Sequence, residues 1–368
     1  MTTRFAPHFL LDPPRYPAER FAPLADRAKR LLGTTADLVF IQSDAMLALQ
    51  TAAASIARPG TTAVNIVTSP YGVWFGTWLR RGGMKVRDVK AGPGQPVDID
   101  AVVACVEALP SVDVVACVHA ESSNGVLNPL PQIAALARSH DAFCVVDAVA
   151  SVGGHALEFD AWGIDIAVAS AQKALSGPAG VSFVAVSQRA WRRVVQTPDE
   201  APSILSLWDL KRNWLERGRG ALPGTPATLE FWALEAAFDR VDAQGIDALI
   251  ARHARATRAT RMGLRALGVV PPVARDDAAS ALITAAPVPE GVDVAAMLAH
   301  AADKGVELTR GFGDTGANIV RLNHTGVRAA FEAVLANVVA YGSALDEQRF
   351  AVDVGGAAQA VREAYSMR

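Results

Sequence analysis

Cysteine is scarce in this chain, and no stretch of it is long and apolar enough to suggest a membrane span. The three cysteines, Cys105, Cys117 and Cys144, lie within or next to apolar segments and form neither a CxxC pair nor a zinc-ligand pattern. An odd number of such cysteines indicates reduced thiols in a cytoplasmic protein, with no disulfide framework and no metal site. Membrane helices need about 18 consecutive apolar residues. We therefore expect no membrane partner.

An excess of either charge is also missing. Lys and Arg total 35 against 37 Asp and Glu, and no block of like charge occurs. A basic stripe is the usual mark of a nucleic-acid-binding protein, so we expect no nucleic-acid partner. The N-terminus has neither the apolar core nor the cleavage site of a signal peptide. With 368 residues, the chain is long enough for two domains of ordinary size.

Short apolar runs alternate with helical patterns over the first half of the chain. The pattern predicts strands at 38–41, 63–67, 85–89, 112–118, 143–147, 164–169 and 181–186, and helices at 44–57, up to 78, 99–108 and 133–138. Continuous apolar strands that are each followed by a helix indicate a mostly parallel sheet covered on both faces. The last two strands are separated by a glycine-rich turn. The expected fold class is therefore α/β.

The pattern changes after Gly245. A long helix at 250–267 is followed by strands at 280–284, 306–309 and 319–323, with a helix at 294–304 between the first two. This order predicts a small α+β domain. The proline-containing opening, up to Pro23, is typical of an extended arm. We divide the chain into an arm (1–16), a large cofactor-binding domain (17–245) and a small C-terminal domain (246–368).

Polar residues follow several of the predicted strands. In parallel sheets ligands bind beyond the carboxyl ends of the strands. Asp147 ends one strand, and Lys173 comes just after another and before a glycine- and proline-rich turn. Burial of a lysine lowers its pKa, which suits an amine that forms a Schiff base. The alternative from spacing alone is a structural Asp–Lys ion pair at the sheet edge.

Several spaced motifs resemble one enzyme family. They are VVDAVASVGG (145–154), FDAWGID (159–165), SAQKAL (170–175), HAESSNGVLNP (119–129) and IVRLNHTG (319–326). Together they resemble the class V aminotransferases of the fold-type I vitamin B6 family, in particular its alanine–glyoxylate (serine–pyruvate) and pyridoxamine–pyruvate members. A set of motifs in the family's order is far more specific than one short pattern. The resemblance implies a homodimer or higher homo-oligomer with active sites at the subunit interface.

The resemblance also implies roles for individual residues. Lys173 would form the Schiff base with the cofactor and shuttle protons, and Asp147 would pair with the pyridine nitrogen. Val149 would press on one face of the ring and Tyr71 would stack on the other. Without the family pattern, Tyr71 is more simply a half-buried aromatic residue at a strand end.

Four further positions match binding residues of the family. Ser122 would bind the ring oxygen, and Arg321 would clamp the substrate carboxylate, as arginine does bidentately. Gln172 and Thr225 match positions that hold the cofactor phosphate, the threonine being donated by the second subunit. From residue type alone, Ser122 and Thr225 are turn residues and Arg321 is a surface residue.

The first cofactor-binding turn departs from the family. Relatives that bind phosphate tightly have a glycine-rich turn there, whereas this chain has Ser43, Asp44 and Ala45. Asp44 is a good helix N-cap, and that role alone would explain it. Its carboxylate would also repel a phosphate dianion at the helix N-terminus. The cofactor is then pyridoxal 5'-phosphate, or unphosphorylated pyridoxal or pyridoxamine bound as a substrate.

The sequence favours a transaminase acting between a small amino donor and a small 2-oxo acid, pyruvate or glyoxylate. Two alternatives keep the fold: a lyase or desulfurase, and a catalytically silent B6-binding protein. Phe312 stands where the pyridoxamine–pyruvate enzymes have a second substrate arginine, and Arg310 nearby is a candidate substitute. His119 and His324 lie in matched motifs, but we expect structural roles for both.

Overall fold

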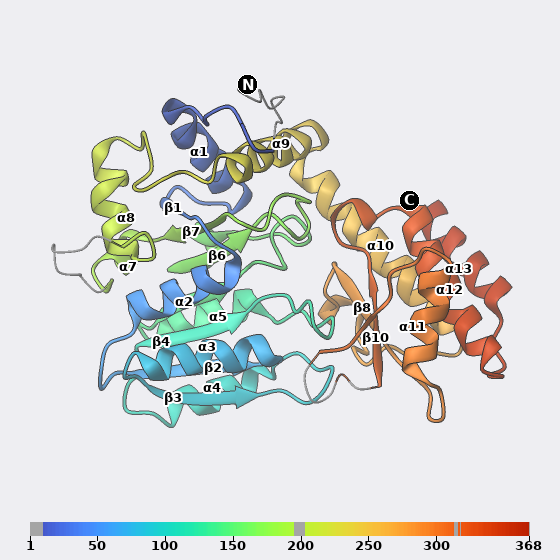
Figure 1. Ribbon diagram of the computed structural model, residues 1–368. Coiled ribbons are helices and arrows are strands. Elements are labelled where there is room, and N and C mark those ends of the chain that lie inside the picture. The colour runs from blue at the N-terminus through green and yellow to red at the C-terminus, as the bar shows by residue number, and fades with distance from the viewer. Residues whose placement is uncertain (1–9, 195–202, 313–315, 317, 368) are drawn as a thin grey trace, which may run out of the picture.

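The structure is a computed structural model that describes residues 10–194, 203–312, 316 and 318–367. Its larger part is built on a seven-stranded sheet in the order β1-β7-β6-β5-β4-β2-β3 (Figure 1). The strands are β1 (Asp37–Ile41), β2 (Thr62–Val67), β3 (Lys85–Lys90), β4 (Val114–Val118), β5 (Phe143–Asp147), β6 (Ile166–Ser170) and β7 (Ser182–Val186). All neighbours pair in parallel except β7, which is antiparallel to β1 and to β6. The predicted α/β class is confirmed.

Burial explains why these segments are strands. Every residue of β4, β6 and β7 is buried, as expected of a sheet covered on both faces. By contrast, β3 lies at one edge, and Lys85, Arg87, Asp88 and Lys90 on it are exposed. Charged side chains on an edge strand oppose pairing with another sheet.

Helices cover this sheet, and they lie largely where the sequence predicts. They are α1 (Phe21–Leu31), α2 (Ala45–Ile56), α3 (Pro70–Arg81), α4 (Ile99–Glu107), α5 (Leu130–Ser139), α6 (Phe159–Trp162), α7 (Gln188–Trp191) and α8 (Leu207–Asn213). α2 packs on α3 and α4 on α5, while β2 contacts both α3 and α4. The helices therefore form layers on the two faces of the sheet.

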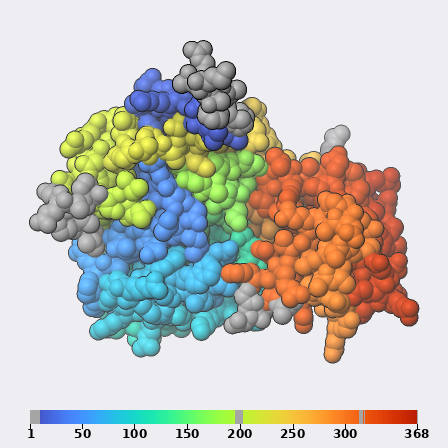
Figure 2. Space-filling view, in the orientation of Figure 1, coloured from blue at the N-terminus to red at the C-terminus, as the bar shows by residue number. Residues whose placement is uncertain are grey.

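The C-terminal part has its own sheet and core. Antiparallel strands β8 (Ile283–Pro287), β10 (Ile319–Asn323) and β9 (Thr309–Arg310) pack with α10 (Ile246–Ala266), α11 (Val294–Asp303), α12 (Phe331–Glu347) and α13 (Val354–Ser366). Its apolar cluster runs from residue 256 to residue 364. Figure 2 shows this part, in orange and red, packed against the flank of the larger one. The predicted small α+β domain is confirmed, and the limits of the three segments stay a prediction.

One junction joins the two parts. α9 (Thr228–Gln244) ends at Gly245, where α10 begins, and the backbone there has φ 85°. A positive φ is readily adopted by glycine, so the chain can change direction without unwinding either helix. Figure 1 shows the two helices running from the larger part into the C-terminal part.

Several predicted bounds are wrong. The opening is not extended up to Pro23, because that proline lies in the first turn of α1, where proline is tolerated. α10 begins at 246 rather than 250. β8 covers 283–287 rather than 280–284, and β9 covers 309–310 rather than the predicted 306–309. No helix in the described part of the chain is long and apolar enough to cross a membrane.

An aromatic cluster anchors α9 to β1 and α1. The ring of Phe231 lies 4.8 Å from that of Phe21, 5.4 Å from that of Phe40 and 5.6 Å from that of Tyr16, measured between centroids. Phe231 and Phe21 are edge-to-face, a favourable arrangement for aromatic pairs. Phe231 is fully buried. Its ring thus joins α9 to two elements near the start of the chain.

Phe231→Ala should lower the free energy of unfolding by about 3–5 kcal/mol, because it removes a buried ring and leaves a cavity. The shift in the midpoint of urea unfolding measures this loss. Leu229→Ala, two residues away on an exposed position, is the control and should change stability by less than about 0.5 kcal/mol. Equal effects of the two substitutions would contradict the role of the cluster.

Candidate active site

A cavity of about 120 Å³ lies beyond the carboxyl ends of the parallel strands. It is lined by Asp44, Ala45, Met46, Leu49, Tyr71, Val118, Ala120, Ser122, Asp147, Val149, Ala150, Gln172 and Lys173. The residues come from the segments that follow β1, β2, β5 and β6 and from β4 and the segment after it. Most of the positions predicted from the sequence are thus brought to one place, because parallel strands end at the same edge of a sheet.

Lys173 follows β6 and is half-buried in this cavity. Its Nζ lies 3.5 Å from Ser122 Oγ. Burial and the nearby positive charge of Arg321 lower the pKa of the Lys173 ammonium, while Asp147 acts in the opposite direction. A lowered pKa leaves more of the amine neutral and nucleophilic at neutral pH.

Asp147 is the last residue of β5 and is almost fully buried. Its Oδ1 accepts a hydrogen bond from the backbone N–H of Val149 at 2.9 Å. Burial raises the pKa of Asp147 to about 6, against the effects of that N–H and of Lys173. A cationic partner inside the cavity would favour the ionised carboxylate.

A second cavity of about 430 Å³ adjoins the first and shares Ser122, Gln172 and Lys173 with it. Arg321, on β10, lines this second cavity. Its Nη1 donates to the backbone carbonyl of Ser122 and its Nε to that of Arg310, both at 3.1 Å. The guanidinium is therefore held next to Lys173 by two carbonyl groups.

Asp44 caps α2. Its Oδ1 accepts from the backbone N–H of Leu47 at 3.2 Å. The first turn of a helix presents unpaired N–H groups and a partial positive charge, and anions bind there. In this chain a carboxylate takes up part of that capacity, and the same side chain lines the 120 Å³ cavity. The predicted N-cap role is confirmed.

Tyr71 lies at the second position of α3, after the N-cap Ser69, and not at a strand end. Its ring is stacked with that of Phe312, with the centroids 6.1 Å apart, and Trp74 meets both rings edge-on. Phe312 therefore contacts the aromatic residue of the cavity. Arg310 lines neither of the two cavities. Its backbone carbonyl accepts a hydrogen bond from Nε of Arg321.

Two predicted cofactor residues do not line the cavity. Ser43 lies next to it, and its carbonyl accepts a hydrogen bond from Ser182 at 3.0 Å. Thr225 is exposed on the surface of this single chain. The family resemblance implies that Thr225 binds the cofactor phosphate in the site of a second subunit, and this role stays a prediction.

Glu121 is a buried group to which the sequence analysis gave no role. Its Oε1 accepts from Thr68 Oγ1 at 2.6 Å, while its Oε2 is buried with no hydrogen-bond partner. Burial raises the pKa of Glu121 to about 7, against hydrogen bonds from Ser69 and Thr68. In the sequence, only the position of Glu121 directly before Ser122 indicates that this residue lies near the site.

His324 lies in a matched motif and has structural partners. His324 is buried, with Nε2 3.0 Å from Thr284 Oγ1 and Nδ1 3.1 Å from the carbonyl of Ala281, which agrees with the predicted structural role. Neither cavity is lined by a cysteine. Among the described residues, no group of three or more His, Cys, Asp and Glu is placed to hold a metal ion.

Ionisation of Asp147 should make the stability of the protein without cofactor depend on pH. Its pKa is about 6 when folded against 3.8 ordinarily, so its contribution is fully present below about pH 4. As the pH rises towards 6 that contribution is lost, on the order of 3 kcal/mol. Asp147→Asn should remove this component from the pH profile of urea unfolding. If the unfolding free energies of the unmodified protein and of Asp147→Asn differ by the same amount at every pH, Asp147 does not cause the pH dependence.

The chain resembles known transaminases in sequence and in structure. The family model described as Aminotransferase class-V matches residues 22–337. The pyridoxamine–pyruvate transaminase of Mesorhizobium japonicum is 32% identical, over 88% of this chain and 82% of that protein. The alanine–glyoxylate aminotransferase of Drosophila melanogaster is 27% identical, over 78% of this chain and 73% of that protein.

A solved structure agrees with these matches. The crystal structure of pyridoxamine–pyruvate aminotransferase from Mesorhizobium loti superposes with a TM-score of 0.88 at 29% identity, covering 94% of this chain and 88% of that chain. The fold expected from the sequence, a fold-type I aminotransferase, is confirmed. The chain belongs to the class-V aminotransferase family of pyridoxal phosphate-dependent enzymes.

Proposed function

We propose that this transaminase moves an amino group between a small amino donor and a small 2-oxo acid, pyruvate or glyoxylate. One observation carries the proposal: Lys173 and Asp147 line one cavity, and Arg321 lines the cavity that adjoins it. An amine, a carboxylate and a guanidinium in this arrangement match the three tasks of covalent binding, ring pairing and substrate anchoring.

The residues of the cavity fit a vitamin B6 ring. Gln172 Oε1 is buried without a hydrogen-bond partner in the described part of the chain, and such an unpaired acceptor is typical of a site that binds a ligand. Asp147 uses Oδ1 for the Val149 N–H, which leaves Oδ2 to accept from a protonated ring nitrogen. Val149 and Tyr71 both line the cavity and would contact the two faces of the ring. Bound there, the ring would supply an electron sink for chemistry at the substrate Cα.

Lys173 would act twice. Its amine would first hold the cofactor covalently and, once released by the amino donor, would take the Cα proton as a general base. The lowered pKa favours both tasks, because each needs the neutral amine. Ser122 Oγ, 3.5 Å from Nζ, would hold the amine and bind the ring oxygen.

Arg321 would bind the carboxylate of the substrate. Its Nε and Nη1 are held by backbone carbonyls, which orients the planar group before a substrate arrives. The adjoining cavity also presents Asn323 and Thr325, neutral side chains that suit a short polar acid. Pyruvate and glyoxylate, named for the relatives described above, are acids of this kind.

The identity of the amino donor depends on Asp44. Its carboxylate sits at the helix N-terminus where an anion would bind, so we infer that pyridoxamine without a phosphate is the donor and is released as pyridoxal. A 5'-hydroxyl could donate to Asp44. Gln172 favours the other candidate, an amino acid donor with a bound phosphorylated cofactor, because this position matches the phosphate-binding relatives.

Two other activities have weaker support. A desulfurase of this fold needs a cysteine that reaches the substrate, and Cys117 and Cys144 are buried while Cys105 lines neither cavity. A silent B6-binding protein would have no use for a guanidinium next to Lys173. The exposed Thr225 supports a homodimer in which it completes the site of the partner.

Borohydride reduction in the presence of pyridoxal should attach the label to Lys173, because burial keeps this amine more nucleophilic than an exposed lysine. Mass spectrometry of peptides identifies the labelled position. Lys173→Arg keeps the charge and should abolish labelling, and Lys211→Arg, elsewhere in the chain, should not. Labelling of another lysine, or of none, would refute the proposed site.

Turnover identifies the donor. Pyridoxamine with pyruvate should give pyridoxal and alanine, which are followed by absorbance and chromatography. Formation of products only from alanine or serine with glyoxylate would refute pyridoxamine as donor and keep the aminotransferase. Sulfide release from cysteine would favour the desulfurase.

Asp44→Ser should bind pyridoxal phosphate at least about tenfold more tightly than the unmodified protein, because it removes a negative charge next to the phosphate site. Serine keeps the helix cap, so stability should be little changed. Fluorescence titration with pyridoxal and with pyridoxal phosphate gives both dissociation constants, and pyridoxal is the control. Tight binding of the phosphate form by the unmodified protein would show that Asp44 does not exclude it.

A further inference from the structure

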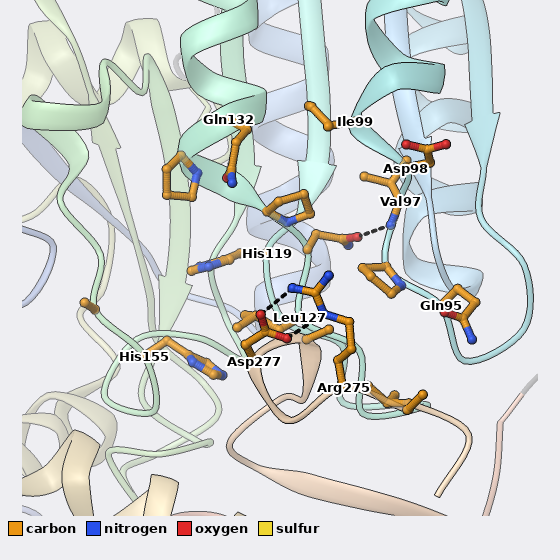
Figure 3. Close-up of a pocket in the computed structure, with 18 of the residues that line it drawn as sticks. Gln95, Val97, Asp98, Ile99, His119, Leu127, Gln132, His155, Arg275 and Asp277 are labelled. Carbon is orange, nitrogen blue, oxygen red and sulfur yellow. Dashed lines mark hydrogen bonds and ion pairs between the residues drawn. The ribbon is translucent and has the colours of Figure 1, made fainter.

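A larger cavity lies behind the candidate active site. Its volume is about 650 Å³, within the range of about 300–1,000 Å³ usual for small-molecule sites. Figure 3 shows it between the segment that carries Gln95 and Val97, the start of α5 with Gln132, and the segment that carries Arg275 and Asp277. None of its lining residues belongs to the set around Lys173.

The two cavities are separated by the thickness of one strand. Val118 and Ala120 line the 120 Å³ cavity, whereas His119 between them lines the 650 Å³ cavity. Successive side chains of an extended chain point to opposite sides, so this alternation places the cavities back to back. The end of β4 is therefore a shared wall.

His119 is the polar group at that wall. The residue is 4% exposed, and its Nδ1 is buried with no hydrogen-bond partner among the residues that the structure describes. The edge of its ring meets Trp162, with centroids 6.1 Å apart at 89°. Burial, and then the nearby His155, lower the pKa of His119 to about 3. The ring is therefore neutral at pH 7 and offers one donor and one acceptor.

The rest of the lining favours an uncharged ligand. Apart from Asp98, Arg275 and Asp277, its side chains are apolar or neutral, among them Val97, Leu127 and Trp162. Asp98 is exposed, and its carboxylate caps α4. Arg275 and Asp277 are exposed and pair with each other, Nε donating to Oδ1 at 2.9 Å. A charge buried next to His119 would lack a partner and would be costly.

Hydrogen bonds connect this cavity to the active site. The backbone N–H of His119 donates to the carbonyl of Asp147 at 2.9 Å. The side chain of Asn128 accepts from the N–H of Val97 at 3.0 Å and donates to Thr68 Oγ1 at 2.9 Å, and Thr68 donates to Glu121. The bond from the N–H of Val97 is drawn in Figure 3. A ligand that moves this wall would move the residues that hold Asp147 and Ser122.

We propose that the 650 Å³ cavity is a second binding site, for a small neutral molecule with a flat apolar body and a hydroxyl group. The hydroxyl would hydrogen-bond to the imidazole of His119, and the body would lie against Trp162 and Leu127. Occupation of the site changes the affinity of the cofactor cavity through the shared strand end.

Phenol is the probe, because it is flat, has one hydroxyl and is uncharged at pH 7. Isothermal titration should show millimolar binding of phenol to the unmodified protein, and binding of toluene or benzoate at least about tenfold weaker. Toluene lacks the hydroxyl and benzoate carries a charge. Equal binding of phenol and toluene, or no binding of phenol, would overturn the assignment.

Two variants test the location. His119→Phe keeps a ring but removes both nitrogens, and should weaken phenol binding about tenfold. Gln132 is exposed on α5 at the mouth of the cavity, so Gln132→Trp should obstruct entry while Gln132→Ala, the matched control, should bind phenol normally. If His119→Phe fails to fold, Gln132→Trp against Gln132→Ala still decides the question.

The coupling is tested by titrating pyridoxal with and without saturating phenol. The dissociation constant of pyridoxal should change at least about threefold, and phenol binding should change by the same factor when pyridoxal is present. An unchanged constant would overturn the coupling. The phenol titrations need no B6 compound, so failure of the proposed transaminase chemistry would be separable from failure of this site.

Discussion

The cost of burying charge at the end of a sheet governs this molecule. Desolvation alone would make Lys173 less basic and Asp147 more so, and both effects are present. Pairing of the two charges would raise the pKa of Lys173 and lower that of Asp147. Burial acts in the opposite direction on each residue and is the larger effect. The proposed B6 ring would give Asp147 a cationic partner and would bind the amine of Lys173 covalently.

The same reasoning applies to Asp44 at the N-terminus of α2. A helix N-terminus offers a limited number of N–H groups, and a side chain that accepts from Leu47 N competes with any external anion for them. Capping stabilises the helix by about 1 kcal/mol. The capping of α2 depends on this carboxylate, and the proposed exclusion of a phosphate dianion rests on the same side chain. A neutral cap at this position would separate the two effects.

How far the sequence predicts the structure depends on the range of the interactions. The strands of the large sheet are continuous apolar runs, and a buried run of five residues such as β4 has few alternatives. The motif order places Ser122, Asp147 and Lys173 at one edge because parallel strands share that edge. The predicted position of β8 is three residues too early. The actual position is set by pairing with β10, in which the partners are at least 32 residues apart in the sequence, as in Ile319↔Pro287 and Asn323↔Ile283.

Side-chain contacts between distant segments are beyond such reasoning. Nothing local to Phe312 predicts that it stacks on Tyr71, and nothing local to Arg321 predicts that a carbonyl of the Ser122 loop will hold its guanidinium. Both contacts join the β9–β10 region to the cofactor cavity. A shift of the C-terminal part would therefore move Phe312 and Arg321 relative to Tyr71 and Lys173, so the lining of both adjoining cavities depends on how this part packs against the larger one.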